Sequence, residues 1–289
     1  MQFLKSLLKL VYYKYYYYTM SKLKRQKLNQ LLQQIQAHLA ITQHWLSQQG
    51  YSYTLVKRYV ESNWLTRIGH GAYARSGDTV TWQGALCALQ KQLELPIHIG
   101  AKSALQFLGK AHYLAFAPQQ QFTELYWHAS VKTERLPKWC NEYAWDKPMR
   151  LHRDKLFSEA GIGLTEFKPN DHVFSLKIST PERAILEMLA GVPDFYSLNE
   201  AYKIMEGLVS LRYEIVQTLL ECCLSHKVKR LFLLFADLTQ QPWFKRLELK
   251  KINLGKGKRS IAGGGKYYPQ YLLSIPSFST EDNNEEEIP

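Results

Sequence analysis

The side chains best placed for chemistry in this chain belong to a short segment between Gly50 and Arg75. On a helix with 100° per residue, four apolar side chains of this segment share one arc of about 140°: Leu55, Val56, Tyr59 and Val60. Basic residues occupy the opposite side. An arginine can pair with guanine through two hydrogen bonds, and a lysine can contact a phosphate as a point charge. The segment therefore predicts a helix that enters a groove of duplex DNA through Ser52, Tyr53, Thr54, Lys57 and Arg58.

A hairpin is expected immediately after this helix. The alternating run from Trp64 to Ile68, the turn Gly69-His70-Gly71 and the run from Ala72 to Arg75 are typical of two short strands joined by a tight turn. Three residues on its strands or tip could contact phosphate or enter the minor groove: Arg67, His70 and Arg75. For His70 a second interpretation stays open, since a histidine in a turn is often merely exposed.

Two helices are expected before the basic one. Leucine and isoleucine recur at helical spacing between Lys24 and Ala40. Thr42 is a good N-cap for a second helix, Gln43 to Gln49, which ends at Gly50, and Ser52 caps the third. Two short helices around a glycine-containing turn, followed by a hairpin, predict a winged helix-turn-helix domain over residues 21–78.

Positive charge is unevenly distributed along the chain. The formal net charge is +12, and five acidic residues lie between positions 281 and 287, so the remainder carries +17. Residues 21–78 hold eight basic and two acidic side chains, and residues 250–268 hold six basic and no acidic ones. Such clusters suit a polyanion, because phosphate neutralisation requires local lysine and arginine. The second cluster is either a nucleic-acid backbone contact or a solvated surface loop, with four central residues: Lys256, Lys258, Arg259 and Lys266.

No motif reaches a recognisable active site. The glycine-rich segment 255–266 lacks the spacing of a phosphate-binding loop, and Tyr267 stands where Ser or Thr should follow Lys266. Asp154, Glu166 and Lys168 match a magnesium-dependent nuclease only loosely, and solvated strand-edge charges are the simpler interpretation. Neither a nucleophile motif nor metal-ligand spacing is present in the sequence. We therefore expect no cofactor, no metal site and no enzymatic activity.

The four cysteines form no CxxC pair, and their spacing fits neither a disulfide framework nor a zinc site: Cys87, Cys140, Cys222 and Cys223. Reduced thiols indicate a reducing compartment. We expect a cytoplasmic protein.

The two ends of the chain differ from the rest. Lys5, Lys9 and Lys14 interrupt every apolar run of the tyrosine-rich residues 1–20, which predicts neither a signal peptide nor a membrane span. We interpret these residues as a mis-assigned start before Met20 or a disordered extension, with an amphipathic membrane-surface anchor as the alternative. Residues 277–289 form an acidic tail that we expect to be disordered.

From Val80 onward the pattern changes to mixed helices and strands, which predicts a larger α/β domain over residues 79–276 and an α+β fold for the chain. The basic run Lys227, Lys229 and Arg230 is interpreted as a surface cluster. Helices are expected at Trp82–Leu93, Lys102–Lys110, from Pro181, and at Ser197–Glu206, Tyr213–Leu224 and Val228–Leu238. Strands are expected at Pro96–Ile99, Phe122–Trp127, Phe174–Ile178, Leu247–Leu254 and Tyr271–Ile275.

Several collinear blocks resemble the AbiE-type antitoxins, the AbiEi family of bacterial type IV toxin-antitoxin and abortive-infection systems. They are WLTRIGHGAYARSGD, WQGALCALQ, HIGAKSALQFLGKAHYL, LPKW, TPERAILEML, KVKRLFLLFA and LGKGKRSIAGGGKYY. The likeness spans roughly Leu28 to Pro276 and leaves out both ends of the chain.

This resemblance implies a winged-helix domain that represses its own operon at inverted repeats, and a C-terminal domain tied to antitoxin activity. It implies a nucleotidyltransferase-like toxin as the functional partner, without need for a stable complex. Two alternatives stay open: a winged-helix transcription factor without a toxin, and a winged-helix protein whose second domain processes nucleic acid. A neighbouring toxin gene would favour the antitoxin over both alternatives.

Overall fold

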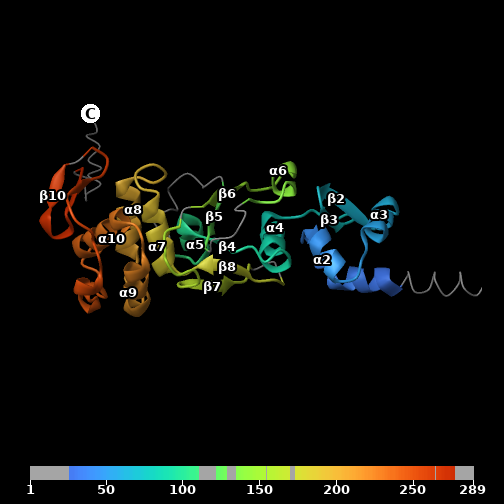
Figure 1. Cartoon of the computed structure of the whole chain (residues 1–289), viewed down its shortest axis with the longest axis horizontal. Helices are drawn as coiled ribbons and strands as arrows, with labels where there is room; N and C mark the ends of the chain where they lie inside the picture. The colour runs from blue at the N-terminus through green and yellow to red at the C-terminus, as the bar shows by residue number, and fades with distance from the viewer. Residues whose placement is uncertain are drawn as a thin grey trace, which may run out of the picture. The chain divides into compact units, whose positions relative to one another are not determined.

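The computed structural model describes residues 26–110, 122–128, 135–153, 155–169, 173–263 and 265–276 (Figure 1). The interpretations of residues 1–20 and 277–289 therefore lie outside the described residues. The chain divides into two compact units, one comprising Met1–Ala88 with Pro137–Trp145, the other Leu89–Leu136 with Asp146–Pro289. The domain limits expected at residues 78 and 276 stay predictions.

The first unit has the element order of a winged helix-turn-helix. A helix over residues 26–34 is followed by β1 (Ile41–Thr42), α2 (Gln43–Gln48), α3 (Tyr53–Glu61), β2 (Leu65–Gly69) and β3 (Ala72–Arg75). The strands form an antiparallel sheet in the order β1-β3-β2. Two further helices, α4 (Trp82–Cys87) and α6 (Trp139–Glu142), belong to the same unit.

Local capping sets the helix starts of this unit. The Thr42 hydroxyl accepts a hydrogen bond from the Trp45 amide at 3.2 Å, and the Ser52 hydroxyl accepts one from the Leu55 amide at 3.3 Å. Between the two helices Gly50 adopts φ +80°, a conformation that favours glycine. These are the two N-caps and the turn expected from the sequence.

The apolar faces of the three helices and of the hairpin meet in one core. In α3, Val56 and Tyr59 are buried, and Leu55 and Val60 pack against the cluster from its edge. The other buried members are Leu31, Ile35, Ile41, Leu46, Tyr51, Leu65 and Tyr73. Burial of this face fixes which side of α3 is left for solvent.

The second unit is built on a five-stranded mixed sheet in the order β6-β5-β4-β8-β7. Its strands are β4 (Ile97–Ile99), β5 (Thr123–Trp127), β6 (Met149–His152), β7 (Leu164–Phe167) and β8 (Leu176–Ser179). The β4–β8 and β5–β6 pairs are parallel, whereas the β4–β5 and β7–β8 pairs are antiparallel.

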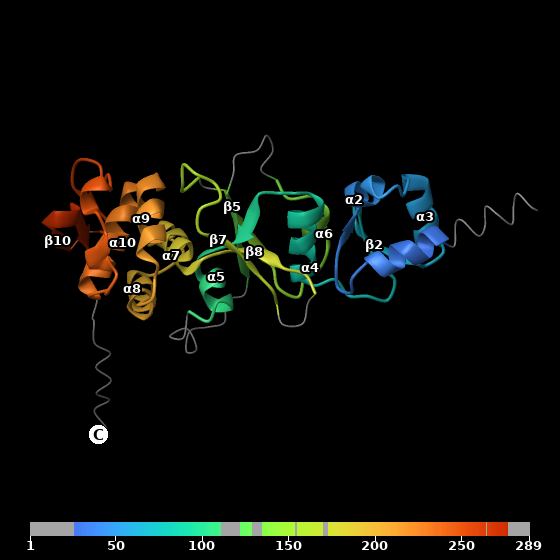
Figure 2. The same ribbon diagram turned by 90° about the horizontal axis from the view of Figure 1, so that it is seen from below.

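Helices extend the second unit from one end of this sheet. Figures 1 and 2 show α7 (Pro181–Ala190) between the sheet and a group made of α8 (Leu198–Gly207), α9 (Tyr213–Cys222) and α10 (His226–Leu238). The helix α5 (Ala101–Phe107) packs against α7 and β5. A small sheet of β9 (Arg259–Ser260), β10 (Lys266–Tyr268) and β11 (Leu273–Ile275) closes the described part.

This architecture confirms the predicted fold class, an α+β chain with an N-terminal winged helix-turn-helix and a larger α/β part. The strand expected at Leu247–Leu254 is wrong, because those residues contain a short 3-10 helix, Leu249–Lys251. The buried apolar residues of this segment, Leu247 and Ile252, are five positions apart, so buried and exposed side chains do not alternate as they would in a strand. Within the described residues, no helix is long and apolar enough to cross a membrane.

Candidate nucleic-acid interface

The exposed face of α3 and its N-cap, Ser52, together carry all five residues predicted to enter a DNA groove. Ser52, Tyr53, Thr54, Lys57 and Arg58 are exposed, and Tyr53 exposes 65% of its surface. The Lys57 ammonium lies 3.8 Å from the Glu61 carboxylate, one helical turn away. Both side chains are largely solvated, so this pair holds Lys57 only weakly. The face is therefore free to meet a polyanion.

The hairpin places its three predicted residues at different heights. His70 occupies the turn, and Arg67 lies two residues before the end of β2, where its Nε donates to the Gly69 carbonyl at 3.1 Å. Arg75 pairs in register with Leu65, at the end of the hairpin far from the turn. All three side chains are exposed. The structure thus brings Arg67 and His70 together near the tip and separates Arg75 from them.

The helix α6 packs against β2 near the tip of this hairpin, a contact that the sequence did not suggest. The Glu142 carboxylate accepts a hydrogen bond from the His70 backbone amide at 2.9 Å. A Cβ atom on Gly69 would lie 2.6 Å from the Trp139 Cβ, so only glycine permits this approach. Trp139 itself is buried, with 2% of its surface exposed.

The second basic patch consists of exposed side chains on β9, β10 and the loop before them. Lys258 lies over the Tyr267 ring at 4.8 Å and Lys266 over the Tyr268 ring at 5.2 Å. The four residues predicted to form the patch are all exposed: Lys256, Lys258, Arg259 and Lys266. A lysine ammonium over a tyrosine ring is attracted by the ring and remains charged, so the surface of this patch stays positive.

The loop of this patch is anchored by hydrogen bonds from the buried Arg230 to its backbone. Arg230 is 2% exposed, and its guanidinium donates to the carbonyls of Leu254, Gly257 and Leu272 at 2.8 to 2.9 Å. The interpretation of Lys227, Lys229 and Arg230 as a surface cluster is therefore wrong. Lys229 is 3% exposed, and the Lys227 ammonium donates to the carbonyls of Ala190 and Val192. Lys229 and Arg230 therefore belong to the interior, and Lys227 is held by carbonyls at the end of α7.

The residues of the weak nuclease pattern do not assemble into a metal site. Glu166 accepts hydrogen bonds from Lys91 at 3.1 Å and from the Ser175 hydroxyl. The Ser175 bond, with Lys91, lowers the pKa of Glu166. Lys168 is exposed, and Asp154 lies outside the described residues. In the described ranges, no group of three or more His, Cys, Asp or Glu residues could hold a metal ion.

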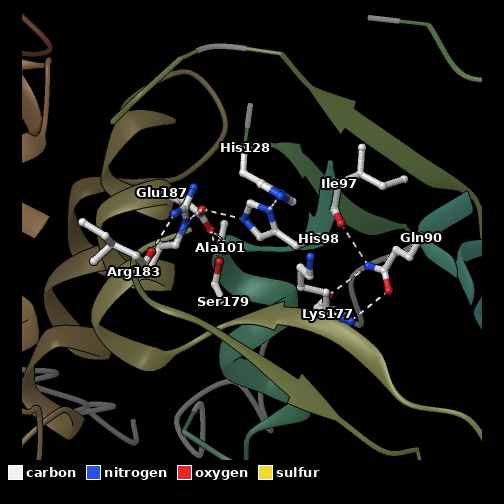
Figure 3. A network of polar contacts seen from close by, with 10 residues as sticks. Gln90, Ile97, His98, Ala101, His128, Lys177, Ser179, Arg183 and Glu187 are labelled. Carbon is white, nitrogen blue, oxygen red and sulfur yellow. Dashed lines mark hydrogen bonds and ion pairs between the residues drawn. The ribbon is translucent and has the colours of Figure 1, made fainter. Parts of the chain in front are cut away.

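A buried polar network in the second unit has its hydrogen bonds satisfied internally (Figure 3). The Glu187 carboxylate accepts from Arg183 Nε at 2.7 Å, His98 Nε2 at 2.8 Å, the Ser179 hydroxyl at 2.8 Å and the Ala101 amide at 3.1 Å. Although burial opposes its charge, His98 and Arg183 lower the pKa of Glu187 to about 2. Four donors on one carboxylate leave it no lone pair for a substrate, so we assign the network a structural role.

Two histidines of this network are kept uncharged. Burial lowers the pKa of His98, and burial together with the neighbouring His98 lowers that of His128 to about 3. Because His98 Nε2 donates to Glu187, its Nδ1 must accept from His128 Nδ1, 3.2 Å away. The network thus holds one buried charge pair and two neutral rings.

Comparison with known proteins places both parts of the chain in one family. Residues 24–116 match the model described as "Transcriptional regulator, AbiEi antitoxin N-terminal domain". Residues 124–276 match the model described as "Transcriptional regulator, AbiEi antitoxin, Type IV TA system". No curated protein matches the chain.

One solved structure with a similar fold is the RV2827C protein from Mycobacterium tuberculosis. Its TM-score is 0.55 at 16% sequence identity, over 82% of this chain and 86% of that one. At this identity the likeness concerns the fold alone.

Proposed function

Because this chain belongs to the AbiEi antitoxin family of type IV toxin-antitoxin transcriptional regulators, we propose that it represses its own operon by binding inverted repeats in the operator. The protein is a regulator and not an enzyme. The contact is made by α3 in the major groove and by the hairpin as a wing. Its residues are Ser52, Tyr53, Thr54, Lys57, Arg58, Arg67, His70 and Arg75.

The observation that carries this proposal is the division of α3 into two faces. Val56 and Tyr59 are buried in the core, and Lys57 and Arg58 lie exposed on the other side. In a helix-turn-helix protein, the second helix of the motif presents such a face to base edges while other side chains fix the register on phosphates. The pair of an arginine and a lysine supplies both kinds of contact.

Binding of the full-length chain to a labelled duplex from the promoter of its own operon tests this proposal. Fluorescence anisotropy against a random duplex of equal length separates operator recognition from general affinity for DNA. We expect tighter binding to the promoter duplex, by at least the roughly thousandfold typical of specific recognition at physiological salt. Equal affinity for both duplexes would contradict the proposal.

The second part of the proposal concerns the toxin. We propose that the larger unit counters a nucleotidyltransferase-like toxin encoded beside this gene, without a stable complex, and that both act in the cytoplasm. All four cysteines are buried thiols, as suits a reducing compartment. Co-expression of the full chain with the neighbouring toxin gene should restore growth. A neighbouring gene of another kind would favour a transcription factor without a toxin.

The other alternative that the sequence left open is a second unit that processes nucleic acid, and membership of a family of transcriptional regulators argues against it. Incubation of the purified chain with Mg²⁺ and labelled DNA or RNA tests it directly. We expect the substrates to stay intact, and cleavage lost on substitution of Glu166 would favour the alternative.

A further inference from the structure

We propose that the segment Pro137–Trp145 contributes to DNA binding, because it contacts the tip of the wing and its Glu142 positions that tip. This inference rests on the proposed operator binding and deepens it. The segment is remote in sequence from the winged helix, and residues 137–145 fall within the family model of the C-terminal part. By its contacts, however, it belongs to the first unit.

The contact is close and specific at the level of the backbone. Gly69 ends β2, and a Cβ atom there would lie 2.6 Å from the Trp139 Cβ and 2.9 Å from the Trp139 Cα. One residue further on, the His70 amide donates to the Glu142 carboxylate at 2.9 Å. The segment therefore fixes both the last strand residue and the turn.

The segment has a small aromatic core of its own. The Trp139 and Trp145 rings meet edge to face with centroids 6.0 Å apart, and the Trp145 indole donates to the Cys140 carbonyl at 2.7 Å. Tyr143 packs on Trp145 at 4.6 Å. These contacts give α6, which has only four residues, a fixed shape that it could not keep as an isolated helix.

The position of α6 shows whether the segment supports the wing or obstructs the DNA-binding face of α3. In both views the hairpin lies between α6 and α3 (Figures 1 and 2). Tyr53, Lys57 and Arg58 are exposed in the structure that contains α6, so the segment leaves the basic face of α3 open. A wing tip held in one conformation loses less entropy on entering a groove than a mobile tip. Glu142 therefore acts as a positioning residue for Arg67 and His70.

The hydrogen bond and the charge of Glu142 make opposite predictions. A positioning bond requires only an acceptor oxygen, which Glu142→Gln keeps and Glu142→Ala removes. A carboxylate acting through its charge would repel phosphate, and both substitutions would then strengthen binding. The exposed neighbour Asn141, on the same helix, provides the control variant Asn141→Ala.

The test measures binding of the full-length variants to the promoter duplex and to a random duplex by anisotropy. Glu142→Ala removes one exposed hydrogen bond, so this variant should bind the operator about three- to tenfold more weakly than the parent protein. Glu142→Gln and Asn141→Ala should stay within about twofold of the parent protein. Thermal melting of each variant checks that the fold is kept.

Hydrogen–deuterium exchange of the peptide spanning Arg67 to Tyr73 reports the geometry directly. The His70 amide should exchange faster in Glu142→Ala and at the parent rate in Glu142→Gln. Tighter binding by both Glu142 variants, equal weakening by both, or unchanged affinity in Glu142→Ala would each overturn the inference. If the parent protein itself shows no preference for the promoter duplex, the proposed function fails instead.

Discussion

Lys57 and Arg58 are neighbours on the exposed face of α3, yet we expect their substitutions to act differently. A guanidinium aimed at a guanine discriminates between base pairs by about 1 to 3 kcal/mol, so Arg58→Ala should weaken operator binding far more than random-duplex binding. A lysine aimed at phosphate contributes equally on every sequence, so Lys57→Ala should weaken both and reduce the salt slope by about one. Anisotropy titrations at several salt concentrations measure both effects. Equal losses on the two duplexes for Arg58→Ala would remove its role in base reading.

The two neutral histidines of the buried network, His98 and His128, predict how stability responds to acid. In the folded protein His128 stays unprotonated until about pH 3, whereas in the unfolded chain it takes up a proton near its ordinary value of 6.5. The pKa of His98 is lowered in the same direction. The unfolded state therefore binds more protons below about pH 6.5, and the free energy of unfolding should fall as pH decreases from 6.5 toward 3. Above 6.5 these two groups contribute no dependence on pH.

Thermal melting between pH 8 and pH 5 checks this sign. The melting temperature should hold steady above pH 6.5 and decline below it. His128→Gln should flatten the decline, and the exposed control His44→Gln should leave it unchanged. A melting temperature that rises on acidification would contradict the neutral assignment.

Among the elements, those that the sequence predicted well are the ones whose signals are local. The starts of α2 and α3 follow from the hydroxyls of Thr42 and Ser52, each of which accepts a hydrogen bond from the backbone amide three residues later. By contrast, α6 has four residues and owes its place to the hairpin of β2 and β3, as the hydrogen bond from the His70 amide to Glu142, 72 positions away, illustrates. No periodic pattern in the sequence can reveal such a contact.

The burial of charged side chains was harder to predict from the sequence than the positions of helices. Lys229 and Arg230 belong to a basic run that looks solvated in the sequence, and both are buried. The acceptor carbonyls of Arg230 belong to Leu254, Gly257 and Leu272, up to 42 residues away. A buried guanidinium requires such acceptors, and only the fold brings them together. The exposed face of α3 could be predicted because helix geometry alone separates it from the core.

The small sheet at the end of the second unit carries a prediction of its own. If its basic patch contacts the DNA backbone, Lys256→Ala with Lys258→Ala should weaken binding to promoter and random duplexes alike. Each lost phosphate contact should reduce the slope of log affinity against log salt by about 0.9. The charge-matched control is Lys110→Ala with Lys168→Ala, which replaces two exposed lysines elsewhere in the second unit. Identical slopes for the two double variants would favour a solvated surface loop.

At the scale of the whole molecule, regulation and antitoxin activity can be separated by one double substitution. A type IV antitoxin that needs no stable complex with its toxin, and no operator to act, should rescue growth even when it cannot bind DNA. We therefore expect Lys57→Ala with Arg58→Ala in the full-length chain to abolish repression of a promoter reporter. The same variant should rescue cells in which the toxin is expressed from an unrelated promoter. Both substitutions are on exposed side chains and should change stability by less than about 0.5 kcal/mol each.

The unrelated promoter is essential to this experiment, because repression of the native operon would itself lower the amount of toxin. Comparable protein levels for parent and variant, checked by immunoblot, exclude loss through degradation. If the double variant fails to rescue under these conditions, neutralisation depends on the exposed face of α3, and antitoxin activity cannot be assigned to the larger unit alone. If it rescues fully, Lys57 and Arg58 serve regulation, and the residues that counter the toxin must be sought elsewhere in the chain.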